Sequence, residues 1–116
     1  DIFRSGLPFP FSLRAPASPG FSVEGALCCK FRGAPAACLK ARLDGEEVSV
    51  FALAAAGLDR FPMAAERFTE KGDEVRCTVE GLNFVMVRRA GVVTTAVGRK
   101  TSEELFALVR QLAAGP

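Results

Sequence analysis

Cysteine is the residue type in this chain most capable of specific chemistry, because the chain contains four cysteines but no histidine, tyrosine or tryptophan. Three of them, Cys28, Cys29 and Cys38, lie in the stretch GALCCKFRGAPAACLK, and Cys77 follows far downstream. Thiols bind soft metals, form disulfides, or pack as small apolar groups. The choice among these depends on the strands that carry them.

A structural zinc site normally takes four ligands, in pairs of Cys or His a few residues apart. Cys28 and Cys29 are adjacent, so on a strand their side chains point to opposite faces and do not coordinate the same metal ion. We therefore expect no metal site and no cofactor. Copper(I) accepts fewer thiolates, so a two-cysteine copper site remains an alternative.

The pairing of the two strands in this stretch decides which cysteines meet. If Phe31 lies opposite Pro35, then Cys28 lies opposite Cys38 and Cys29 points into the core. Directly opposed strand residues have Cα atoms about 4.5 to 5.5 Å apart, within the range that a disulfide spans. We predict a Cys28–Cys38 disulfide in an oxidising compartment. The alternative, four reduced thiols that pack as apolar groups, is the commoner arrangement for buried cysteines.

The strands around this cluster are best defined at Asp44-Gly45, a strong signal for a two-residue β-hairpin turn. The turn predicts a register for the strands on either side. In that register the pairs are Leu43 with Glu46, Ala41 with Val48, Leu39 with Val50, and Ala37 with Ala52. Apolar side chains then gather on one face, as a half-buried antiparallel pair requires.

Three more strands are predicted at 74–80, 83–90 and 92–99, with turns at Gly81-Leu82 and Ala90-Gly91. The segment between the two strand sets is interpreted as an irregular connection with one short helical turn. Both faces of the middle strand of the second set are apolar, which indicates that the sheet is covered on its second side as well.

The last segment, TSEELFALVRQLAAGP, predicts the clearest helix. Thr101 and Glu104 form a capping box, and Leu105, Leu108, Val109 and Leu112 recur at helical spacing. An amphipathic helix after a meander predicts an α+β fold. We expect an antiparallel sheet of about six strands with this helix packed on one face.

The chain is long enough for one domain with a single core. Four prolines interrupt residues 1–21, which we interpret as an extended lead-in. Its apolar side chains predict that it is partly docked on the domain, which comprises residues 22–116.

Composition argues against an enzyme and against nucleic-acid binding. Histidine, the usual general base for Ser or Cys nucleophiles, is absent, and no glycine loop for phosphate joins a strand to a helix. The net charge is only +2. Lys30, Lys40 and Arg42 are predicted to share one sheet face, which is interpreted as a solvated face because exposed aromatic residues for stacking are lacking.

The chain combines a proline-containing lead-in, a turn and strand at Gly33, Pro35, Ala36 and Ala37, the Asp44-Gly45 turn with Val48 to Phe51, a strand with Gly81, Asn83 and Val85, an apolar strand and a terminal helix. In these features it resembles the extracytoplasmic part of bacterial transmembrane anti-sigma-factor-like proteins. The resemblance implies a non-enzymatic sensor or structural domain in the periplasm, tethered to the membrane by a segment outside this sequence. An oxidising periplasm favours the Cys28–Cys38 bond.

Two other classes remain open. One is a small dimerisation or scaffold domain that associates with itself or with a protein partner through a sheet edge. The other is a thiol-based redox or copper sensor. No apolar run in the sequence reaches the roughly 18 to 20 residues of a membrane-spanning helix.

Overall fold

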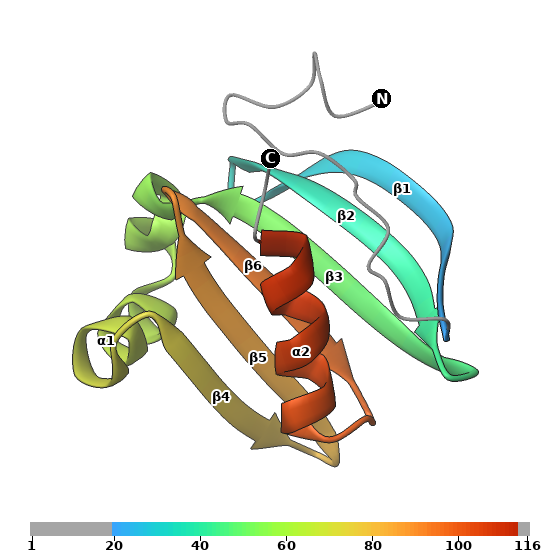
Figure 1. The fold of residues 1–116 in the computed structure, drawn as a ribbon. Coiled ribbons are helices and arrows are strands. Elements are labelled where there is room, and N and C mark those ends of the chain that lie inside the picture. Colours follow the sequence, from blue (N-terminus) through green and yellow to red (C-terminus); the bar gives the residue numbers. More distant parts are fainter. Residues whose placement is uncertain (1–19, 114–116) are drawn as a thin grey trace.

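The computed structural model describes residues 20–113. These residues form one six-stranded antiparallel sheet and two α-helices, which confirms the predicted α+β fold (Figure 1). The elements are β1 (Phe21–Phe31), β2 (Ala34–Leu43), β3 (Glu46–Ala54), a 3-10 helix η1 (Ala55–Arg60), α1 (Pro62–Lys71), β4 (Glu74–Val79), β5 (Leu82–Arg89), β6 (Val92–Gly98) and α2 (Ser102–Ala113). The predicted docking of the lead-in falls on residues 1–19, outside the described residues. β1 begins at Phe21, the last residue assigned to that lead-in.

The order of strands across the sheet is β1-β2-β3-β6-β5-β4. The two three-stranded units therefore join through β3 and β6, and β1 and β4 are the edges of the described sheet. β2 and β3 pair in the predicted register, with Leu39 opposite Val50 and Ala41 opposite Val48. The pairing is set at the turn, where Asp44 and Gly45 both have positive φ, of 52° and 83°.

Helix α2 covers one face of the sheet, which we call the α2 face (Figure 1). Its predicted apolar residues are buried against strand residues that include Val48, Val50, Val85 and Val87. The capping box is also confirmed. Thr101 Oγ1 accepts a hydrogen bond from the Glu104 amide at 3.2 Å, and the Glu104 carboxylate accepts one from the Thr101 amide at 3.4 Å.

The opposite face, the α1 face, is covered at one end by α1. Phe68 of α1 is 1% exposed and packs in a cluster with Ala36, Leu53, Val75 and Val93. A helix of ten residues replaces the irregular connection predicted for this segment. Proline suits the first turn of a helix, where its missing amide donor has no partner in any case.

Two predicted turns are displaced by one residue. The β1–β2 turn contains only Arg32 and Gly33, with φ of 50° and 82°, so Phe31 pairs with Ala34 rather than with Pro35. The β4–β5 turn is Glu80-Gly81 rather than Gly81-Leu82. In each turn a charged residue takes the left-handed conformation beside a glycine, which matches the twist of the strands. The Ala90-Gly91 turn is confirmed.

Candidate functional site

The one-residue change at the first turn redistributes the cysteines over the two faces. Cys28 pairs with Ala37, a residue of the α2 face, and Cys38 pairs with Leu27 on the α1 face. Leu27 and Cys29 are two residues apart on β1, so their side chains point to the same side of the sheet. Cys29 therefore lies on the α1 face together with Cys38. Cys28 and Cys38, predicted to lie opposite each other, are therefore on different sides of the sheet.

A disulfide joins Cys29 to Cys38, and their Cα atoms are 6.7 Å apart. The predicted Cys28–Cys38 disulfide is therefore wrong in its first member. The two linked residues are diagonal neighbours across β1 and β2 rather than directly opposed, which accounts for a separation near the upper end of the usual range. Cys29 and Cys38 are both half-buried, and Cys29 packs against the cluster around Phe68.

The other two cysteines lie outside this bond. Cys28 is exposed on β1, and Cys77 is half-buried on β4. Of the thiol and carboxylate side chains that the structure describes, no three converge as metal ligands.

The predicted basic face is divided by the same change of register. Lys30 lies on the α2 face, whereas Lys40 and Arg42 lie on the α1 face. Lys40 is 3.5 Å from Glu47, and Arg42 is 3.2 Å from Glu24. Neighbouring carboxylates thus balance these cations, so they do not form one positive surface.

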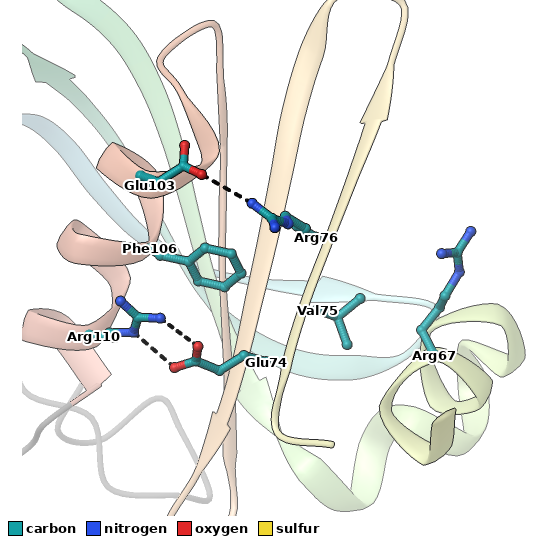
Figure 2. Close-up of a pocket in the computed structure, with 7 residues that line it drawn as sticks. All are labelled: Arg67, Glu74, Val75, Arg76, Glu103, Phe106 and Arg110. Atoms are coloured by element: carbon teal, nitrogen blue, oxygen red, sulfur yellow. Dashed lines mark hydrogen bonds and ion pairs between the residues drawn. The ribbon is translucent and has the colours of Figure 1, made fainter. Parts of the chain in front are cut away.

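A groove of about 660 Å³ lies along edge strand β4, between α1 and α2 (Figure 2). Glu74, Val75 and Arg76 of β4 form its floor. Its walls are Arg67 of α1 on one side and Glu103, Phe106 and Arg110 of α2 on the other. Three arginines and two glutamates therefore line it, a formal balance of +1.

Two ion pairs cross this groove from α2 to β4. Arg110 donates two hydrogen bonds to the Glu74 carboxylate, and Arg76 lies 3.2 Å from Glu103 (Figure 2). The bonds from Arg110 hold the pKa of the Glu74 carboxyl below its ordinary value, and the carboxylate raises the pKa of Arg110 in return. Among the side chains that the structure describes, none forms an ion pair with Arg67.

Sequence reasoning did not identify this groove. Its arginines come from three elements, at positions 67, 76 and 110, and only the folded chain brings them to one edge. One signal was available. Phe61, Ala64, Ala65 and Phe68 recur at helical spacing, and a helix at this position would have placed Arg67 beside the next strand.

Neither helix in the described part of the chain has the length and apolar character needed to cross a bilayer. Comparisons with known proteins found no matching family model, curated protein or solved structure.

Proposed function

We propose that this chain is a non-enzymatic regulatory domain, located outside the cytoplasmic membrane, of a membrane-anchored anti-sigma-factor-like protein. The Cys29–Cys38 disulfide carries this proposal. Disulfides persist in the periplasm and outside the cell, whereas cytoplasmic reductants keep most thiols reduced. The likeness to anti-sigma-factor-like domains at Gly33, Pro35 and Asp44-Gly45 supports the same location.

The groove along β4 supports binding rather than catalysis. A general acid or base needs a pKa near the working pH, but the arginine beside Glu74 moves the pKa of that carboxyl further from neutrality. Glu103 is engaged by Arg76. With no histidine in the chain, the groove offers fixed charges and an open strand edge. Those features suit the recognition of another protein.

Reporter fusions placed directly after residue 116 of this sequence, within the natural full-length protein, test the location. Alkaline phosphatase is active only after export, and green fluorescent protein exported in unfolded form does not fluoresce. We expect an active phosphatase fusion and a dark fluorescent-protein fusion. A fluorescent fusion with an inactive phosphatase would place the domain in the cytoplasm and refute the proposal. Matched fusions to a known cytoplasmic protein control for expression.

A redox sensor is the second candidate, because Cys29 and Cys38 are each partly exposed. Reduction by a dithiol would add two electrons and two protons, break the S–S bond and release two thiols, while the dithiol becomes a disulfide. This step would free edge strand β1 from its covalent link to β2. Faster amide hydrogen exchange in β1 after reduction would support a sensor. Identical exchange in the two forms would eliminate it.

A further inference from the structure

Along β4, an edge strand of the described sheet, successive residues alternate between directing their backbone N–H and C=O groups toward β5 and directing them away from it. Val79 and Leu82 flank the two-residue Glu80-Gly81 turn, so they form a hydrogen-bonded pair. Hydrogen-bonded and non-hydrogen-bonded pairs alternate along the strands from there. The Arg88 amide donates a hydrogen bond of 2.8 Å to the Asp73 carbonyl, as this alternation requires. The amide and carbonyl groups of residues 74, 76 and 78 therefore point away from β5, toward the groove.

The two sides of this edge differ in chemistry. Glu74, Arg76 and Thr78 project to the α2 face, where Arg110 also lies. Cys77 and Val79 project to the α1 face, and Val79 is 52% exposed. A strand added beside β4 would therefore place alternate side chains next to arginines and next to apolar groups.

Positive charge in the groove is available to a ligand. The side chains of Arg76 and Glu103 are 61% and 78% exposed, and such surface ion pairs contribute little to stability. Arg76 therefore loses little interaction energy when a ligand carboxylate takes the place of the Glu103 carboxylate. Arg67 adds a further positive charge on the α1 side of the groove (Figure 2).

We infer that the β4 groove binds an extended acidic segment of a partner protein, which adds to the sheet as a seventh strand. Main-chain hydrogen bonds to residues 74, 76 and 78 supply affinity, and carboxylates beside Arg76 on the α2 face supply specificity. The inference rests on one part of the proposed function, namely that the domain acts by binding another protein. It does not depend on the compartment.

A second copy of the chain is the competing occupant. A two-fold antiparallel pairing centred on Arg76 would set that residue opposite Arg76 of the other copy, whereas one centred on Val75 would set Glu74 opposite Arg76. The choice of an acidic partner rests instead on the groove as a whole, whose lining carries a formal charge of +1. Self-association is an outcome that the test below distinguishes.

The probe is an acetylated and amidated peptide of four Glu-Val repeats, labelled for fluorescence anisotropy, with four Lys-Val repeats as its matched control. We expect saturable binding of the acidic peptide, weakened by salt, and none of the basic peptide. Equal binding of the two peptides, or binding of neither, would overturn the inference.

Two further peptides separate strand addition from simple charge attraction. One carries N-methyl groups on the glutamate amides and the other on the valine amides, so only one of them blocks the amides that face β4. Loss of binding for one peptide alone supports strand addition. The same affinity for both overturns it. This comparison uses the unmodified protein, so it does not depend on the folding of a variant.

A matched pair of variants then locates the site. Arg76→Pro and Arg76→Thr both remove the guanidinium, but only proline removes the outward amide, which makes no bond to β5. We expect Arg76→Pro to bind the acidic peptide about tenfold more weakly than Arg76→Thr. Equal affinities of the two variants would overturn the inference. It would also be overturned if the wild-type protein sediments as a dimer and Arg76→Pro sediments as a monomer.

The peptide and reporter experiments can fail independently. If the acidic peptide binds but the reporters place the domain in the cytoplasm, the proposed location is refuted and the inference about the groove stands.

Discussion

Arg110 of α2 and Glu74 of β4 form a two-bond ion pair, with N–O distances of 2.9 and 2.5 Å, that connects the C-terminal helix to the edge strand. The pair holds the wall of the groove against its floor. Both side chains remain more than a third exposed, so solvent weakens the attraction between them.

This ion pair gives stability a defined pH dependence. The folded pKa of Glu74 is below the ordinary value of 4.5, so its contribution is complete above the unfolded pKa and is lost as the pH falls through the folded pKa. At pH 7 we expect Glu74→Gln to lower the free energy of unfolding by less than about 1 kcal/mol. The difference from wild type should shrink below pH 4.5. Urea denaturation across this range measures it, with Glu66→Gln on exposed α1 as the control. A difference that grows in acid would contradict the assignment.

The disulfide should stabilise the domain by restricting the unfolded chain. A loop closed over nine residues corresponds to about 2 to 3 kcal/mol in the chain-entropy estimate. We expect the double variant Cys29→Ala and Cys38→Ala to lose that amount in urea denaturation. Cys28→Ala is the matched control and should change stability by less than about 0.5 kcal/mol. A large loss for Cys28→Ala alone would favour the other pairing.

The Ala90-Gly91 turn offers a stabilising substitution. Ala90 has a φ of 53°, a conformation that asparagine adopts more readily than alanine. We expect Ala90→Asn to raise the free energy of unfolding by about 0.5 to 1 kcal/mol. The same change at exposed Ala107 of α2 should lower it by about 0.5 kcal/mol, because asparagine is a poorer helix former. Changes of the same sign at both positions would contradict the turn assignment.

The start of α2 depends on the hydroxyl of Thr101. Removing it leaves the Glu104 amide without its capping acceptor. Thr101→Ala should therefore lower the free energy of unfolding by about 1 kcal/mol, whereas Thr101→Ser should leave it nearly unchanged. Thermal unfolding followed by circular dichroism distinguishes the two variants, and equal losses would show that the cap contributes little.

The sequence predicted those parts of the fold in which local chemistry specifies the backbone. Asp44-Gly45 readily adopts positive φ at both turn positions, so the β2–β3 register followed from it. The Thr101 capping box and the helical spacing of Leu105 to Leu112 located α2 in the same way.

Errors arose where tertiary structure overrode local preference. Arg32 and Glu80 are unusual residues for a left-handed conformation, so their two-residue turns were not identified. A shift of one residue then reversed the faces of Cys28 and Cys29. The groove could not be predicted because Arg67, Arg76 and Arg110 become neighbours only when α1 and α2 pack beside β4.

Peptide mapping of the protein from cells that express the full-length gene, with thiols alkylated before lysis, determines whether the Cys29–Cys38 disulfide forms in the cell. Trypsin cleavage releases residues 15–30 and 33–40 as separate peptides unless a disulfide joins them. We predict a linked pair in which fragmentation assigns the bond to Cys29 and Cys38. Alkylation of both Cys29 and Cys38 in those cells would contradict an extracytoplasmic, disulfide-linked domain.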